Sequence, residues 1–327
     1  MDNSSVLVTG GSGFIGINLV DRLIAEGYRV TNFDKAPPAK GEHRAYWRPV
    51  EILDAGSLAT AIAATQATIV IHLAARQDTD GQQLAEYTMN TDGVANVLAA
   101  LKKLPTIQRF VATSTQFVVG PGPLPAHDLD FRPHTVYGQS KAIGEQLVRK
   151  ADLACTWTII RPTNLWGPWH PRYPREFWRV LKRGFYVHPG RSPVIRCYGY
   201  VETIVDQIFK IITAPPAIVD RRVFYVGDPP LDVLDWANAF SRALRGREVR
   251  VCPRALFRGI VVAGDLANRF GVRIPITSSR FQTMTEDYLV PMAPTFEALG
   301  YPRISLSEGV ERTVRWLRQQ DPFWEAR

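Results

Sequence analysis

The sequence has few cysteines, no long apolar run and no excess of acidic charge. The three cysteines among 327 residues, Cys155, Cys197 and Cys252, are widely spaced and form no C-x-x-C pair. Such a set does not make the disulfide framework of a small secreted domain, so we expect reduced, buried thiols. The first residues, MDNSSVLVTGG, lack the apolar run of a secretory signal. These absences predict a cytoplasmic protein.

Long apolar segments are also missing, although 46% of the residues are hydrophobic. The longest apolar stretch in the second half is GIVVAG at 259–264, whereas a membrane-spanning helix needs roughly 20 residues. We therefore predict a globular chain with a large core and no membrane span.

The net charge of +8 lies entirely in the second half of the chain. Residues 1–164 hold 15 basic and 15 acidic side chains, and residues 165–327 hold 24 and 16. Residues 165–200 alone contain seven basic side chains against Glu176. Such a patch attracts anions. It is equally typical of a solvated helix face, because Arg172, Arg175, Arg179 and Arg183 share helical spacing.

Short apolar runs alternate with helical patterns up to residue 162. The apolar runs predict strands at 5–10, 28–34, 67–75, 107–114 and 155–162, and helices are expected at 14–27, 55–65, 91–104 and 135–152. Gly27 is expected to end the first helix. Alternation of this kind with near-continuous apolar strands is typical of a parallel sheet covered on both faces. We predict a Rossmann-type, doubly wound α/β fold.

Prolines, aromatics and arginines become dense after Pro162, and the apolar runs become shorter. Amphipathic helices are expected at 200–213, 232–246 and 306–320, the last with Ser307 as its N-cap. We predict a cofactor-binding domain over residues 1–164 and a smaller mixed substrate domain over 165–327, with some segments returning to the first.

A glycine-rich turn stands between the first predicted strand and helix. Gly10, Gly13 and Gly16 are spaced as G-x-x-G-x-x-G, which suits a tight turn with the helix N-terminus facing a pyrophosphate. Asp34 ends the second strand, where a carboxylate accepts hydrogen bonds from a ribose 2′-hydroxyl and repels a 2′-phosphate. NAD is therefore expected in preference to NADP, although the neighbouring Lys35 leaves room for both.

YGQSK places Tyr137 and Lys141 four residues apart on one face of a predicted helix. A nearby ammonium lowers the pKa of a phenol, which suits proton exchange with an alcohol or ketone. The hydroxyls of Thr113, Ser114 and Thr115 end the strand just before this helix.

The order of these motifs, with HLAA at 72–75 and RPTNLWGP at 161–168, resembles the extended short-chain dehydrogenase/reductases. More narrowly, the chain is similar to the NAD-dependent epimerase/dehydratase family that acts on nucleotide sugars. The resemblance implies Tyr137 as catalytic acid/base, Lys141 as ligand of the nicotinamide ribose, and Thr115 with Ser114 as partners of the reacting oxygen. It implies further cofactor contacts at Ser12, Phe14, Ile15, Ile52, Leu53, Asp54 (as the adenine contact), Leu73, Ala74, Ala75, Asn90, Thr113 and Pro162. On the substrate side it implies Gln116, Asn164 and Arg172, with Arg196 as a diphosphate ligand.

The chain departs from the family at the position after Thr115. The family's 4,6-dehydratases carry an Asp-Glu pair there, and this chain has Gln116 and Phe117. Neither side chain can act as a carboxyl acid or base, so we do not expect that dehydration.

The favoured hypothesis is a nucleotide-sugar 4-epimerase with NAD and no metal, acting as a homodimer. A 4-ketoreductase would use the same residues. A 3β-hydroxysteroid-dehydrogenase-like enzyme is a further alternative, because residues 253–277 and 295–317 are similar to the tail of that branch. An NAD-binding regulatory protein is the non-enzymatic alternative. No nucleic-acid-binding motif is present, and salt-dependent retention on DNA would be needed to support that partner.

Overall fold

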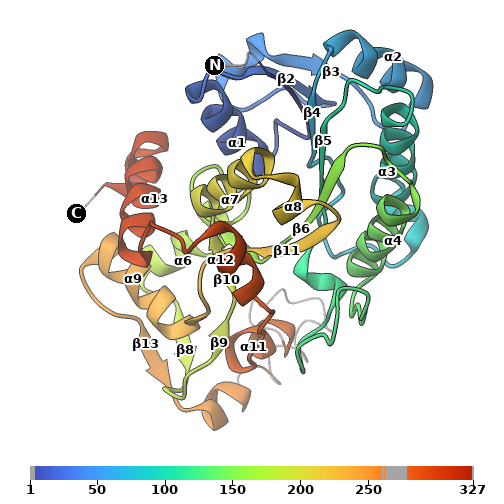
Figure 1. Ribbon diagram of the computed structural model, residues 1–327. Helices are drawn as coiled ribbons and strands as arrows, with labels where there is room; N and C mark the ends of the chain where they lie inside the picture. The colour runs from blue at the N-terminus through green and yellow to red at the C-terminus, as the bar shows by residue number, and fades with distance from the viewer. Residues whose placement is uncertain (1–3, 260, 262–277, 326–327) are drawn as a thin grey trace.

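A seven-stranded parallel sheet forms the centre of the protein in the computed structural model, which describes residues 4–259, 261 and 278–325 (Figure 1). The strand order is β11-β6-β5-β4-β1-β2-β3, and every neighbouring pair runs parallel. The strands are β1 (Ser5–Thr9), β2 (Arg29–Asp34), β3 (Trp47–Pro49), β4 (Ile69–His72), β5 (Arg109–Thr113), β6 (Thr156–Pro162) and β11 (Arg222–Val226). The predicted Rossmann-type fold is confirmed.

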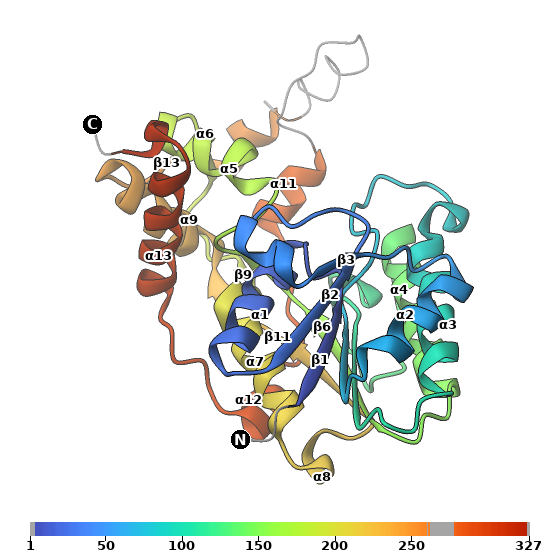
Figure 2. The same cartoon turned by 90° about the horizontal axis from the view of Figure 1, so that it is seen from above.

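Helices cover both faces of this sheet (Figure 2). One face packs against α2 (Ala55–Thr65), α3 (Thr88–Leu101) and α4 (Val136–Lys150). The other packs against α1 (Phe14–Ala25), α7 (Val201–Thr213) and α12 (Ala293–Leu299). Both sides of each central strand are therefore buried, which is why these strands read as continuous apolar runs. Helix α1 ends where Gly27 adopts a φ of 82°, a conformation that glycine takes without strain.

The second half of the chain builds a smaller layer of short elements beside the sheet. Its strands pair two by two as β10 with β7, β12 with β9 and β13 with β8. The strands are β7 (Asn164–Trp166), β8 (Val187–Pro189), β9 (Ile195–Arg196), β10 (Tyr198–Tyr200), β12 (Leu231–Asp232) and β13 (Arg250–Cys252). The helices are α5 (Tyr173–Glu176), α6 (Trp178–Arg183), α9 (Val233–Arg245), α11 (Ser278–Thr285) and α13 (Leu306–Gln320). Helix α8 (Pro216–Val219) instead packs against β6 of the main sheet.

An aromatic cluster forms the core of this layer. Trp166, Trp178, Trp236 and Phe240 are buried and contact one another through their rings. The described residues also form the 3-10 turns η1 (Gly41–Ala45), η2 (Leu84–Tyr87), η3 (Gln116–Val118) and η4 (Pro322–Trp324). Strand β11 lies beyond residue 164 and is nevertheless an edge of the main sheet. The division at residues 164/165 stays a prediction.

Local expectations differ from the structure in several places. Ser305, rather than Ser307, caps α13, because its side chain accepts a hydrogen bond from the amide of Glu308. The helical spacing of Arg172 to Arg183 is divided between α5 and α6. All three cysteines are free, yet only Cys197 is buried, and Cys155 and Cys252 are half-buried. Strand β3 was not anticipated.

Two expectations touch residues that are not described. Most of the apolar stretch 259–264, and most of the segment 253–277 similar to the steroid-dehydrogenase branch, lie outside the described residues. Among the helices that the structure describes, none has the length and hydrophobicity needed to cross a membrane.

Candidate active site

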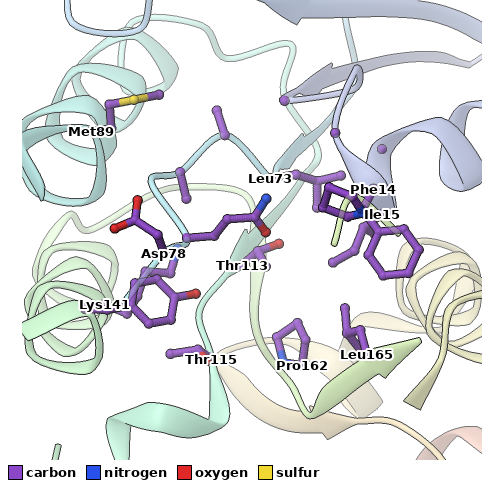
Figure 3. Close-up of a pocket in the computed structure, with 18 of the residues that line it drawn as sticks. Phe14, Ile15, Leu73, Asp78, Met89, Thr113, Thr115, Lys141, Pro162 and Leu165 are labelled. Atoms are coloured by element: carbon purple, nitrogen blue, oxygen red, sulfur yellow. The ribbon is translucent and has the colours of Figure 1, made fainter. Parts of the chain in front are cut away.

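A cavity of about 630 Å³ opens at the carboxyl ends of β1, β4, β5 and β6, where the strand order reverses. Figure 3 shows Phe14 and Ile15 on one side of this cavity and Thr115 and Lys141 on the other. Most of the predicted site residues line it: Gly10, Gly13, Phe14, Ile15, Gly16, Asp34, Lys35, Ile52, Leu73, Ala74, Ala75, Thr113, Ser114, Thr115, Tyr137, Lys141, Pro162, Asn164 and Arg172.

The glycine-rich turn fits a dinucleotide. Gly10 has a φ of 76°, and a Cβ there would lie 2.6 Å from the backbone nitrogen of Ala74. A Cβ on Gly16 would collide with the carbonyl oxygen of Gly10. The turn can therefore close only without side chains, and it leaves the first amides of α1 facing the cavity with no side-chain cap. These amides and the small turn would hold the pyrophosphate of NAD.

Asp34 lies at the end of β2 with its carboxylate fixed by two backbone amides. Oδ2 accepts a hydrogen bond from the amide of Ser12 at 3.1 Å, and Oδ1 accepts one from Ala36 at 3.0 Å. Ser12 does not line the cavity itself, so its contribution is to orient this carboxylate. Lys35 also lines the cavity, with Nζ 3.9 Å from Sδ of Met89, another lining residue.

Two predicted cofactor contacts at the far end of the cleft, Leu53 and Asp54, stay predictions, and Asp54 has a local structural role. The carboxylate of Asp54 caps α2, accepting hydrogen bonds from the amide and hydroxyl of Ser57 at 3.1 and 2.6 Å. Asp54 and Leu53 are not among the residues found to line the cavity, whereas Glu51 is. Glu51 is thus the acidic residue at this end, and its position directly before Ile52 was the available signal.

Tyr137 and Lys141 lie one turn apart in the first half of α4. Thr135 starts this helix by accepting a hydrogen bond from the amide of Gly138 at 2.9 Å. Both site side chains are buried, at 9% and 4% exposure. Burial raises the pKa of Tyr137 to about 12, and a hydrogen bond with Thr115 partly opposes the rise.

The lowering of the Tyr137 pKa by Lys141 stays a prediction, because burial sets the direction of the Tyr137 shift. Burial also acts on Lys141, whose pKa falls to about 8 although Glu145 opposes the shift. Desolvation disfavours the charged forms of both groups.

Several hydroxyls at the cavity lack a partner within the described part of the chain. The side-chain oxygens of Thr113, Ser114 and Thr163 are buried without a hydrogen bond, and all three residues line the cavity. Orphaned polar groups of this kind are normally satisfied by a ligand or water. They can therefore accept or donate hydrogen bonds to a bound polar molecule.

Gln116 and Asn90 are fully buried and do not line the cavity. Neither amide atom of Gln116 has a partner in the described chain. Asn90 instead clamps the loop after β4, donating to the carbonyl of Arg76 and accepting from its amide, both at 2.9 Å. The loop that it holds lines the cavity with residues that sequence reasoning missed, namely Gln77, Asp78, Thr79 and Asp80.

The substrate side combines predicted and unexpected residues. Asn164 and Arg172 line the cavity, and Arg172 forms no ion pair with the described residues. Arg196 does not line the cavity and is 6% exposed. Its Nη1 donates to the carbonyls of Thr283 and Glu286 at 3.2 and 3.0 Å. Further lining residues were not anticipated: Phe33, Val50, Met89, Phe117, Leu165, His170, Pro171 and Tyr173.

Two basic residues of the 165–200 segment contact residues near the C-terminus rather than the cavity. Arg179 lies 3.7 Å from the carboxylate of Asp321, and Lys182 donates to the carbonyl of Glu325. Both cations also lie over the ring of Phe323. Arg172 therefore lines the cavity, whereas its basic neighbours on α6 bind the C-terminal segment. Within the described residues, no group of three or more His, Cys, Asp or Glu side chains is placed to hold a metal ion.

Comparisons with known proteins give a family match, two similar relatives and a similar fold. The model of the NAD dependent epimerase/dehydratase family matches residues 6–227. A 3-beta-hydroxysteroid dehydrogenase of Mycolicibacterium neoaurum is 27% identical over 300 residues, covering 84% of this chain and 80% of that protein. A putative UDP-glucose 4-epimerase of Methanocaldococcus jannaschii is 26% identical over 336 residues, covering 97% and 99%. In fold, the chain is similar to a UDP-glucuronic acid 4-epimerase from Bacillus cereus in complex with UDP-glucuronic acid and NAD, with a TM-score of 0.74, 20% identity and coverage of 97% and 100%.

Proposed function

Because the chain belongs to the NAD-dependent epimerase/dehydratase family, we propose that it is a nucleotide-sugar 4-epimerase. The observation that carries this proposal is the single cavity in which the glycine-rich turn, Tyr137, Thr115 and Arg172 meet. One wall suits a dinucleotide. The other offers a proton-exchanging group and Arg172, which forms no ion pair with the described residues and could bind the substrate diphosphate. The family is NAD-dependent, and Asp34 supports NAD over NADP because its carboxylate repels a 2′-phosphate.

Tyr137 is the proposed acid/base at the C4 oxygen of the sugar. It would take the hydroxyl proton as C4 is oxidised and return it after the 4-keto sugar has turned over. The pKa of about 12 favours the phenol in the cofactor-free protein. Lys141, with a pKa of about 8, would carry its positive charge at pH 7 and favour the phenolate. Thr115 and Ser114 would hold the same oxygen. A bound NAD would supply the acceptor, and then the donor, of the C4 hydride.

The lack of a carboxylate beside Thr115 favours hydride transfer over elimination. Gln116 is buried away from the cavity and Phe117 lines it. Elimination of water across the sugar ring needs an acid and a base at this place, and an amide and a phenyl ring supply neither.

An enzyme acting on an apolar alcohol is a second candidate. The relative from Mycolicibacterium neoaurum spans most of both chains, and Phe117 presents an aromatic ring beside Tyr137 at 6.1 Å between centroids. The guanidinium of Arg196 is bound to backbone carbonyls, which weakens its claim to a diphosphate. A 4-ketoreductase remains a third possibility with the same residues.

The test is a thermal-shift panel of UDP-, GDP-, dTDP- and CDP-sugars and a 3β-hydroxysteroid, followed by turnover without added cofactor. NAD released by denaturing the purified protein should be stoichiometric. Stabilisation by a nucleotide sugar and conversion to its C4 epimer support the proposal. Stabilisation by the sterol alone, or consumption of added NADH by a 4-keto sugar with an empty purified protein, contradicts it.

We also propose a homodimer formed through α3 and α4, by analogy with family members that pair through such helices. Light scattering at micromolar concentration would give twice the chain mass of 36.7 kDa. A single-chain mass that does not change with concentration would reject this assembly.

A further inference from the structure

Tyr288 reaches the catalytic turn from the far end of the chain. Its hydroxyl donates to the carbonyl oxygens of Gln116, at 3.1 Å, and of Val119. The residue is 1% exposed, and burial raises the pKa of its phenol, so the hydroxyl remains a donor. These contacts span 172 and 169 residues of sequence.

The two carbonyls bracket η3, the turn that directly follows Thr115: Gln116 is its first residue and Val119 its C-cap. Thr115 caps this turn by accepting a hydrogen bond from the amide of Phe117 at 3.3 Å. The amide of Val119 donates to the carbonyl of Gln116 at 3.0 Å. A 3-10 turn of three residues has few internal bonds, so an outside donor that bridges its two ends contributes much of what fixes its shape.

Helix α4 limits the turn from the opposite side. A Cβ on Gly138 would collide with the carbonyl oxygen of Phe117. The turn therefore rests directly on the helix backbone beside Tyr137. It is held between this glycine and the hydroxyl of Tyr288, and the Phe117 ring lies 6.1 Å from the rings of both tyrosines.

Tyr288 is itself anchored in the substrate-side layer. Its amide donates to the carbonyl of Ile195 at 3.0 Å, and its carbonyl accepts from the amide of Cys197 at 3.2 Å. The guanidinium of Arg196 lies 5.2 Å above its ring. The position of its hydroxyl is thus set by β9 and not by the turn that it contacts.

From this geometry we propose that Tyr288 is a positioning residue: it holds η3 against α4 and so places the Thr115 hydroxyl against Tyr137 and the reacting oxygen. The inference rests on the proposed roles of Thr115 and Tyr137. Without the Tyr288 hydroxyl, the ends of the turn lose their shared donor. Thr115 then moves relative to Tyr137, its hydrogen bond with the phenol weakens, and the pKa of Tyr137 rises further.

The test compares Tyr288→Phe with Tyr200→Phe in the full-length, cofactor-loaded protein. Tyr200 is a matched control, because it is equally buried at 1% exposure and its hydroxyl donates to Glu202 at 2.6 Å, in the aromatic core of the second layer. Each variant keeps its ring and loses one buried hydroxyl. Hydrogen exchange of the peptide covering residues 113–121 reports on the turn without any substrate.

For Tyr288→Phe we expect faster exchange in that peptide and a fall in kcat of about tenfold, on the scale that a small misplacement of a catalytic group costs. KM should stay within about twofold, and the pKa of the pH profile should move upward. Tyr200→Phe should leave the exchange of this peptide, kcat and the pH profile unchanged. If Tyr288→Phe does not fold, Gly138→Ala displaces the turn from its other side and should produce the same changes.

Unchanged exchange of the turn would overturn the proposal, and so would faster exchange with unaltered kcat and pH profile. A rise in KM with kcat unchanged would also overturn the proposal, because that result would place Tyr288 in substrate binding. If the wild-type protein turns over no nucleotide sugar, the proposed function fails on its own. The exchange comparison then still decides whether Tyr288 holds the turn.

Discussion

The buried Lys141 should make the cofactor-free protein less stable at neutral pH than a variant without the charge. The side chain is 4% exposed, and its pKa falls from 10.5 to about 8 because burial disfavours the ammonium. One unit of pKa corresponds to about 1.36 kcal/mol. The protonated side chain in the folded state thus costs about 3 kcal/mol at pH 7.

The sign of the pH dependence follows from proton binding. Between pH 8 and 10.5 the unfolded chain keeps the Lys141 proton and the folded chain has released it. The free energy of unfolding therefore rises with pH in this window, by about 1.4 kcal/mol per unit at most. Below pH 8 both states are protonated and the full cost remains. Tyr137, with a pKa of about 12, lowers the free energy of unfolding as the pH rises, but only above pH 10.

The assay is urea unfolding of cofactor-free wild type and Lys141→Met from pH 7 to 9.5. We expect the variant to be more stable at pH 7 by up to about 3 kcal/mol, with the difference shrinking toward pH 9.5. Lys102→Met changes an exposed residue on the same face of the fold. Its free energy of unfolding should differ from that of wild type by the same amount at every pH. If the free energy of unfolding of Lys141→Met ran parallel to that of wild type across this pH range, the proposed cost of burying the Lys141 ammonium would be refuted.

Other variants probe the remaining parts of the site. Tyr137→Phe should lose turnover by at least about 100-fold while NAD remains bound on denaturation analysis; retained turnover would remove its acid/base role. Asp34→Gly should narrow the preference for NAD over NADP in binding titrations. An unchanged ratio of the two affinities would exclude Asp34 as the residue that sets this preference. Gly10→Ala should release the cofactor, because its φ of 76° and the nearby Ala74 nitrogen leave no room for a Cβ. Arg161→Met should lower the free energy of unfolding by about 3–5 kcal/mol, because it leaves the buried Glu145 carboxylate unpaired; a loss below 1 kcal/mol would contradict this.

The sequence patterns predict the sheet, the glycine-rich turn and the Tyr137–Lys141 pair because each depends on local periodicity or spacing. Asp54 shows where such patterns become ambiguous. An Asp that precedes a helix fits both a helix N-cap and the adenine contact that the family resemblance implies. In the structure Asp54 caps α2. Strand β3 is three residues long with two of them exposed, so it carries no periodic signal.

The parts that sequence could not predict depend on distant contacts. The pKa of Tyr137 rises because packed neighbours remove water, and motif spacing gives no measure of that burial. Arg196 was expected at a diphosphate, but its guanidinium binds carbonyls that lie 87 and 90 residues away. The bridge from Tyr288 to the catalytic turn likewise depends on how the two halves pack.

The most direct measurement is proton NMR of a nucleotide sugar incubated in D2O with the purified protein and no added cofactor. We predict inversion at C4 with the original hydrogen retained there, because the hydride leaves C4 and returns to the same carbon without exchange with solvent. Tyr137→Phe should show no inversion under the same conditions. Turnover that requires added NADH, or deuterium appearing at C4, would contradict the central claim.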